Sequence, residues 1–300
     1  MTKEEKRWQA EKEVLEAMKS GVPVVNLDIF EKVSQVKLNE TVKNQLDYTL
    51  DLYKEYQENI LKITPALQKH YLETLKNEDI INNQEVEKEN SFLLALYYSI
   101  HSKNAMDDML KWPACVTPEN FVKAHDKLLE GTSSEDKKGL RHDNLKFVGT
   151  YVAGQREIDY FPILENDIDQ AVKSFLNLLN NAKIENEQDA FLKPLSYHGL
   201  LAALQLFQDG NTRYARLIQH LKLWEYTNEV LKKQFPLPII YATKQYAASR
   251  SSYREYIKNI AVLNDDEAWN QWFIFNLKCL QNNIWVNESN IQTLQRRKML

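Results

Sequence analysis

Apolar residues recur at helical spacing along most of the chain. Leu46 and Leu50 line one face of a helix expected to begin near Asn39, and Thr64-Pro65 is a favourable start for the next helix. Further helical patterns cover residues 3–19, 90–101, 117–129, 167–179, 196–204 and 214–224, and return after 236. The pattern therefore predicts a mostly helical protein.

Short polar breaks separate these helices. The N-terminal helix is expected to end before Gly21, and its only aromatic residue, Trp8, is expected to dock it on the body of the protein. Lys193-Pro194 is expected to open the helix over 196–204. The polar stretch 132–139 is where we expect local disorder.

One segment departs from helical spacing. Val148 and Tyr151 precede an expected turn at 153–157, and Ile158 and Tyr160 follow it. Aromatic and β-branched residues on both sides of a short turn are typical of paired strands. The segment predicts a β-hairpin in an otherwise helical chain.

Length, composition and charge narrow the class of protein. The 300 residues are enough to bury one large core or two modest ones, and seven glycines and eight prolines are few enough to suit helices. A net charge of −4 argues against a nucleic-acid binder that relies on bulk charge, although a local basic pocket stays open. We expect a soluble cytoplasmic protein, because no apolar run reaches membrane-spanning length and the charged N-terminus lacks a signal peptide. Cys115 and Cys279 are expected to be buried thiols rather than a disulfide or a metal pair.

A tight turn between two apolar helices carries the candidate chemistry. Asp209, Gly210 and Asn211 follow the helix over 196–204 and lead directly into the next helix. Gly210 permits the positive φ angle that such a turn needs, and Asn211 is suited to cap the following helix. The first-turn amides of that helix and its dipole together form a natural phosphate seat.

Charged side chains around this turn support a polyphosphate site. Arg213 and Arg216 lie three residues apart and hence on one helix face, and each guanidinium is able to hold a phosphate through two hydrogen bonds. The Asp209 carboxylate suits a Mg²⁺ ion that bridges phosphate oxygens. The alternative is an ordinary turn between two helices with solvated arginines, and spacing alone does not decide between them.

The same stretch resembles the motif of the Fic (Fido-fold) family, His-x-Phe-x-(Asp/Glu)-Gly-Asn-x-Arg-x-x-Arg. Six positions match, namely Phe207, Asp209, Gly210, Asn211, Arg213 and Arg216. Gln205 stands where the family has its catalytic histidine, and Leu206 and Thr212 replace the proline and the second glycine of many members. The resemblance implies a helical Fic fold with one β-hairpin flap. It divides the chain into an N-terminal helical region (1–110), a Fic core (111–228) and a C-terminal helical region (229–300).

The resemblance also implies a reaction. Fic enzymes typically transfer AMP from ATP to a protein hydroxyl, and the motif histidine takes the hydroxyl proton. Gln205 is a neutral amide that does not take a proton near pH 7, and loss of a general base costs a factor of about 10² to 10⁴. ATP or another nucleotide would still be bound by Gly210, Asn211, Thr212, Arg213 and Arg216, with Mg²⁺ at Asp209. We therefore expect a nucleotide-binding Fic homologue with weak, altered or absent transferase activity.

Two other interpretations stay open. One is an active transferase that uses a different base or substrate. His198 lies two helical turns before Gln205, but we expect it to be a packed structural histidine rather than a replacement base. The other is a helical interaction protein whose motif is a relic. The expected partners are a nucleotide and an unidentified protein target or regulator, without a membrane or nucleic acid, and a homo-oligomer is compatible with the sequence.

In the family, the hairpin serves as a flap whose edge aligns a target segment by strand addition. The resemblance assigns this docking role to Tyr151, Val152, Ala153, Gly154, Ile158 and Tyr160. The alternative is a hairpin with a structural role only.

Some Fic proteins carry an inhibitory helix with the motif Ser/Thr-x-x-x-Glu-Gly/Asn. Thr74 and Glu78 fit this motif, with Asp79 in place of Gly or Asn. The resemblance implies that Glu78 pairs with Arg216 and blocks the place of the γ-phosphate. The stretch 85–90 fits the motif less well, and the alternative for Glu78 is a charged helix end that faces solvent.

Overall fold

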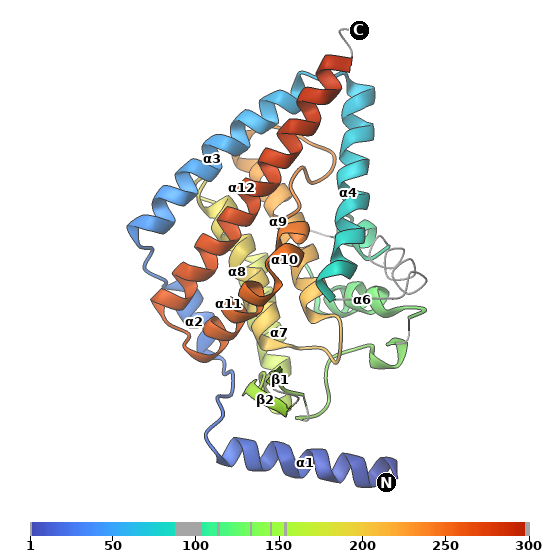
Figure 1. Cartoon of the computed structure of the whole chain (residues 1–300), viewed down its shortest axis with the longest axis vertical. Helices are drawn as coiled ribbons and strands as arrows, with labels where there is room; N and C mark the ends of the chain where they lie inside the picture. The colour runs from blue at the N-terminus through green and yellow to red at the C-terminus, as the bar shows by residue number, and fades with distance from the viewer. Residues whose placement is uncertain are drawn as a thin grey trace.

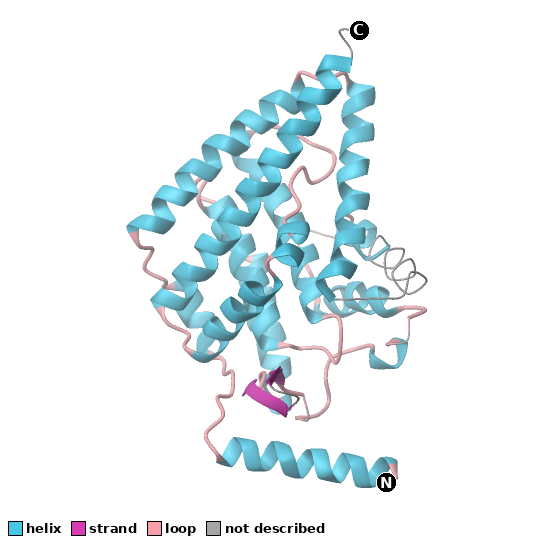
Figure 2. Cartoon of the chain, viewed as in Figure 1, coloured by secondary structure: helices cyan, strands magenta, loops and turns pink. Residues whose placement is uncertain are grey.

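The computed structural model describes residues 2–87, 104–112, 115–132, 134–144, 146–152 and 155–297 (Figures 1 and 2). Within these residues the protein is a body of helices with one small two-stranded antiparallel sheet at its edge. The predicted fold class, mostly α with one β-hairpin, is confirmed. The helix expected over 90–101 and the flap residues Ala153 and Gly154 lie outside the described residues.

The elements follow the chain in the order of Figure 1. The N-terminal helices are α1 (Lys3–Lys19), α2 (Asp28–Ser34), α3 (Glu40–Leu61) and α4 (Pro65–Glu87). The middle of the chain holds α6 (Pro118–Leu129), the strands β1 (Val148–Val152) and β2 (Gln155–Tyr160), α7 (Ile168–Asn180), α8 (Asp189–Leu204) and α9 (Asn211–Leu231). The C-terminal helices are α10 (Thr243–Ala248), α11 (Arg250–Val262) and α12 (Asp266–Arg297). Two short 3-10 helices cover Glu135–Lys137 and Glu165–Asp167.

Helices α8 and α9 form the centre of the molecule, and they pack against each other more extensively than any other pair of elements (Figure 1). Residues 197–204 of α8 are all buried, because apolar or small side chains occupy almost every face of its last two turns. Helices α3 and α12 run side by side along one flank, and α4 packs against α10. The turn that joins α8 to α9 is therefore anchored at both ends in the core.

The hairpin sits at one end of this helical body. Strand β1 pairs with β2 from Val148 opposite Tyr160 to Val152 opposite Gln155, so the turn is shorter than the expected 153–157. Hydrogen bonds from the Val25 amide to the Phe161 carbonyl (2.9 Å) and from the Phe161 amide to the Pro23 carbonyl (2.8 Å) attach the segment after α1 to the end of β2. The hairpin is thus tied to the N-terminal part of the chain.

Two expectations about buried side chains are wrong. Trp8 does not dock α1 on the body, because its side chain is 67% exposed; Val14 is the buried one among the α1 side chains that the structure describes. Cys115 is exposed in the loop before α6, whereas Cys279 is buried as expected, and both are free thiols. Trp8 thus leaves an apolar group of α1 in solvent.

Two expectations about local order are also wrong. Helix α8 begins at Asp189 and contains Pro194, because the Asn186 side chain accepts the Asp189 amide (2.8 Å) and starts the helix before the proline. The stretch 132–139 is ordered where it is described, since it contains a 3-10 helix and the buried side chain of Ser134. In the described part of the chain, no helix is both long and apolar enough to cross a bilayer.

Close packing against Gly199 gives a test of the central helix. A Cβ atom at Gly199 would lie 2.9 Å from the side chains of Ile260 and Trp272. Alanine favours a helix over glycine by about 1 kcal/mol, but overpacking costs about 1–3 kcal/mol. We expect Gly199→Ala to lower the free energy of unfolding, measured with urea, relative to Ser196→Ala one turn earlier. A stabilised variant would show that the neighbouring side chains move aside.

Candidate functional site

The turn between α8 and α9 begins with a left-handed residue. Gln205 has φ 49° and ψ 56° and ends helix α8. Its side-chain Nε2 donates a hydrogen bond of 2.7 Å to the carbonyl of Ala202, in the last turn of the same helix. The Gln205 side chain therefore closes the end of α8.

Asn211 fixes the shape of the turn from inside. Its Oδ1 accepts the Phe207 amide (2.9 Å), and its Nδ2 donates to the Phe207 carbonyl (2.8 Å). Asn211 is the first residue of α9, and Gly210, with φ 74°, precedes it as the capping residue. The expectation that Asn211 caps α9 is therefore wrong, since its side chain serves the preceding turn instead. The positive φ angle expected at Gly210 is confirmed.

Helix α6 supports the turn through a buried histidine. The His125 ring stacks on Phe207 with centroids 3.6 Å apart and planes 9° apart. Its Nε2 lies 2.8 Å from the Asp209 carbonyl, and it donates there because a carbonyl oxygen only accepts. A Cβ atom at Gly210 would lie 3.2 Å from the same Nε2, so glycine also suits this position sterically.

A buried arginine holds the start of the turn. The Arg141 guanidinium donates to the carbonyls of Gln205 (3.3 Å), Asp143 and Ile163, and the Arg141 amide donates to the Leu206 carbonyl (2.9 Å). These bonds join the turn to the segment before the hairpin. Arg141 belongs to the Gly-Leu-Arg stretch at 139–141.

The Asp209 carboxylate is surrounded by donors and cations. It accepts the Ser134 hydroxyl and the Gly210 amide, both at 2.7 Å, and lies 3.6 Å from the Lys137 ammonium and from the Arg213 guanidinium. Burial alone would raise the pKa of Asp209, but Ser134, Arg213 and the Gly210 amide outweigh burial and hold that pKa below its ordinary value. The carboxylate is therefore ionised at neutral pH.

A Mg²⁺ ion at Asp209 would need ligands beyond the side chains of this turn. Among the described residues, no group of three or more His, Cys, Asp or Glu side chains is placed to hold a metal ion. Magnesium commonly takes one or two carboxylates and completes its shell with phosphate oxygens and water. The ionised carboxylate thus fits a Mg²⁺ ion that arrives with a polyphosphate.

Both motif arginines are buried in the first turns of α9. The Arg213 residue is 5% exposed, and Arg216 has no exposed surface. They stand where the positive end of the α9 dipole and its first-turn amides favour an anion. The structure therefore brings Asp209, Gly210, Asn211, Thr212, Arg213 and Arg216 together in one turn and the helix start that follows it.

Lys146 is a site residue that the sequence interpretation missed. Its Nζ donates to the carbonyls of Phe207 (3.0 Å) and Gln208 (2.8 Å), on the outer side of the turn. Burial lowers the pKa of Lys146 to about 8, against an opposing effect of Asp209. No local pattern marks this lysine, because its partners lie 61 and 62 residues further along the chain.

The expected inhibitory residues lie on α4. Glu78 is exposed and Thr74 donates to the His70 carbonyl, whereas Arg216 is fully buried. The carboxylate of this turn that reaches α9 belongs to Asp79, whose Oδ2 lies 3.4 Å from Nδ1 of the buried His220. Restraint of Arg216 by Glu78 stays a prediction, and the geometry of this turn favours Asp79 as the residue that ties α4 to α9.

The remaining residues singled out from the sequence lie in the hairpin and in α8. Tyr151 and Val152 lie in β1, and Ile158 and Tyr160 lie in β2, with Tyr160 buried. His198 is fully buried, with Nδ1 against the Gln219 side chain and Nε2 2.8 Å from the Tyr253 hydroxyl. Burial lowers the pKa of His198 well below its ordinary value, so it stays neutral, as a packed structural histidine does.

In the described residues, a helical body, one hairpin and a tight turn between two central helices define the class of fold. Residues 115–223 match the model of the Fic/DOC family. Three solved structures share the fold. A Fic family protein from Desulfovibrio desulfuricans G20 has a TM-score of 0.62 and 16% identity, over 85% of this chain and 76% of that one. Fic-1 from C. elegans has a TM-score of 0.55 and 15% identity, over 82% and 71%. A Fic-domain signaling protein from Bacteroides thetaiotaomicron VPI-5482 has a TM-score of 0.58 and 12% identity, over 82% and 97%.

The family match covers residues 115–223, and the three solved structures share the fold. At these identities the structural likeness concerns the fold alone. The matched segment falls within the expected core at 111–228, but the limits of the three expected regions stay a prediction. No curated protein matches the chain.

Lys146, which is hydrogen-bonded to the turn, gives a test by pH. Because Lys146 has a pKa of about 8 in the folded protein, the unfolded chain binds more protons between pH 8 and about 10.4, and stability should rise with pH there. We expect the free energy of unfolding of the wild type, relative to that of Lys146→Met, to increase by up to about 1 kcal/mol per pH unit over this range. Urea unfolding at pH 7.5, 8.5 and 9.5 measures this difference. Lys183→Met, at an exposed lysine, is the control, and parallel pH profiles for all three proteins would contradict the assignment.

Proposed function

We propose that this protein is a Fic-like nucleotide-binding protein, related to enzymes that transfer AMP from ATP to a protein hydroxyl, with impaired or altered transfer. The observation that carries the proposal is the division of the turn into two halves. The half around Asp209, Arg213 and Arg216 concentrates an ionised carboxylate, two guanidiniums and a helix N-terminus. The half around Gln205 holds a neutral amide bonded to its own helix.

The binding half supports a nucleotide with Mg²⁺. Phosphate oxygens are suited to the first-turn amides of α9 and to the two arginines, whose charge they would balance. Mg²⁺ would bridge phosphate oxygens to the Asp209 carboxylate, and it would supply charge stabilisation to any transfer at phosphorus. Holding a polyphosphate in this way requires no proton acceptor.

The catalytic half does not support rapid proton removal. Gln205 has no basic atom, and its Nε2 is held by the Ala202 carbonyl. His198 and His125 are both buried, and their ring nitrogens contact other groups of the protein, so neither is presented as a replacement base. The family role of the flap strands, docking a protein target, remains part of the proposal.

Nucleotide binding is tested by calorimetric titration of ATP with Mg²⁺. Removal of a charged phosphate contact typically costs about 1.5–3 kcal/mol, so we expect Arg213→Gln to weaken binding about 10- to 100-fold. Arg254→Gln, at an exposed arginine of α11, should bind like the wild type. Thermal melting without ligand establishes that each variant is folded. Equal binding by all three proteins, or none to the wild type, would contradict the proposal.

The missing base is tested by restoring it. Gln205 has a left-handed backbone, a conformation in which histidine is enriched, so Gln205→His should be accommodated. We expect incorporation of label from ATP carrying a labelled α-phosphate to rise about 10² to 10⁴-fold in this variant. Incubation with a protein extract, followed by gel autoradiography, measures the label. Gln205→Asn is the control, and equal labelling by both variants would show that more than the base is lost.

A further inference from the structure

One oxygen of the Asp209 carboxylate already faces a cation that the chain itself supplies. Oδ2 accepts the Ser134 hydroxyl at 2.7 Å and lies 3.6 Å from the ammonium of Lys137. Mg²⁺ binds a carboxylate oxygen at about 2.0–2.1 Å. An ion that reached Oδ2 would therefore have to displace the groups that lie in front of this atom.

The other oxygen of the same carboxylate is held by the turn and by α9. Oδ1 accepts the Gly210 amide at 2.7 Å and lies 3.6 Å from the Arg213 guanidinium. The Gly210 amide belongs to the turn itself, and Arg213 is buried, so neither donor moves without disturbing the start of α9. The side chain of Lys137 is 47% exposed. Oδ2 is thus the oxygen at which an ion would exchange, and Lys137 is the group that it would displace.

The short 3-10 helix that carries Lys137 is fixed at both ends. Before it, Ser134 is buried and donates to Asp209; after it, the Gly139 amide donates to the Asp126 carboxylate at 2.7 Å. The ammonium is therefore tethered close to the carboxylate. A tethered group acts at an effective concentration on the order of millimolar or higher, so it competes with millimolar Mg²⁺ in solution.

The site offers less to a metal ion than to a phosphate. In the part of the chain that the structure describes, no group of three or more His, Cys, Asp or Glu side chains could hold a metal, so an ion at Asp209 would take most of its ligands from phosphate and water. A lysine ammonium binds phosphate as a point charge, and a guanidinium binds it through two hydrogen bonds. With Lys137 at one carboxylate oxygen and Arg213 at the other, a phosphate meets two cations without any metal.

We infer that Lys137 competes with Mg²⁺ for Asp209 and takes over part of the role of the ion, so that a nucleotide binds at this turn with little dependence on Mg²⁺. This competition rests on the proposed function, because it concerns the nucleotide at that same site. Phosphate oxygens contact the Lys137 ammonium directly, and Lys137 determines which cation balances their charge.

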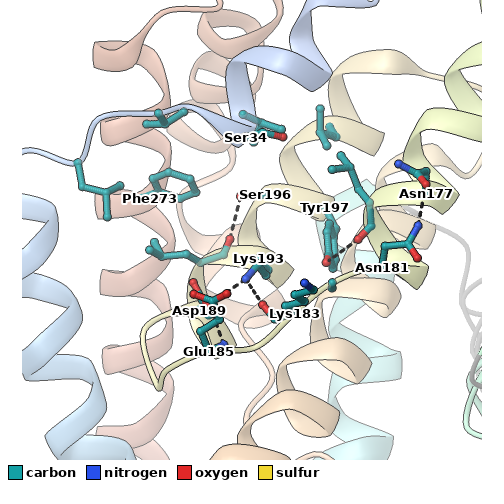
Figure 3. Close-up of a pocket in the computed structure, with 17 residues that line it drawn as sticks. Ser34, Asn177, Asn181, Lys183, Glu185, Asp189, Lys193, Ser196, Tyr197 and Phe273 are labelled. Atoms are coloured by element: carbon teal, nitrogen blue, oxygen red, sulfur yellow. Dashed lines mark hydrogen bonds and ion pairs between the residues drawn. The ribbon is translucent and has the colours of Figure 1, made fainter.

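A groove between α2, α7, α8 and α12 supplies a control for the place of binding. It has a volume of about 580 Å³, and none of residues 205–216 lines it (Figure 3). Figure 3 shows its Lys193 beside Asp189, and the two charged groups lie 2.8 Å apart. Lys193→Met should therefore leave ATP binding unchanged. Weaker binding by this variant would place the nucleotide in the groove and overturn the role of Lys137.

Calorimetric titration of ATP in buffer with Mg²⁺ and in buffer with EDTA tests the competition. We expect the wild type to bind ATP with similar affinity in both buffers. Lys137→Met should bind metal-free ATP about 10- to 100-fold more weakly, because one charged contact is lost, and Mg²⁺ should restore most of this affinity. Lys137→Arg keeps the charge and should resemble the wild type. Lys138→Met is the matched control, because Lys138 pairs with Glu135 at 2.9 Å.

Two kinds of result overturn the competition, and they differ in what they leave standing. If the wild type binds ATP only with Mg²⁺, or if Lys137→Met and Lys138→Met respond to Mg²⁺ alike, Lys137 does not compete with the ion, and the proposed nucleotide binding stands. If the wild type binds ATP in neither buffer, the proposed function fails as well.

Discussion

The pair of hydrogen bonds between the Asn211 amide and the main chain of Phe207 is the constraint on which the rest of the site depends. It folds the turn back on the start of α9 and leaves the Asn211 side chain unable to act elsewhere. Phe207 is then placed on the His125 ring, and the Asp209 carbonyl is placed against the same histidine. Arg213 and Arg216 then lie in the first turns of α9, directly after the turn.

The sequence interpretation works where structure is local. Helical periodicity locates α3, α7 and α9, and the hairpin follows from aromatic and β-branched residues on both sides of a short turn. The positive φ angle at Gly210 is also predicted correctly, because glycine in a short turn between two helices indicates it. In these segments the spacing of apolar residues and the residues of the turns predict the same local structure.

The sequence interpretation fails where a contact joins residues that are far apart in the sequence. Ser134, Arg141 and Lys146 hold the turn from a segment about 60 to 75 residues earlier, and their own neighbours give no sign of it. Pro194 suggested a helix start, but side chains at 186 and 189 begin α8 earlier. Asp79, rather than Glu78, faces α9, because the phase of α4 is set by packing that a motif does not record.

The position of the turn between α8 and α9 determines how the turn unfolds. These two helices form the centre of the molecule, and the groups that shape the turn are bonded to α6 and to the segment before the hairpin. Regions with such dense buried contacts open only when the whole domain opens. We therefore expect the turn to unfold together with the domain rather than separately. The turn is therefore formed whenever the domain is folded, and it is lost when the domain unfolds.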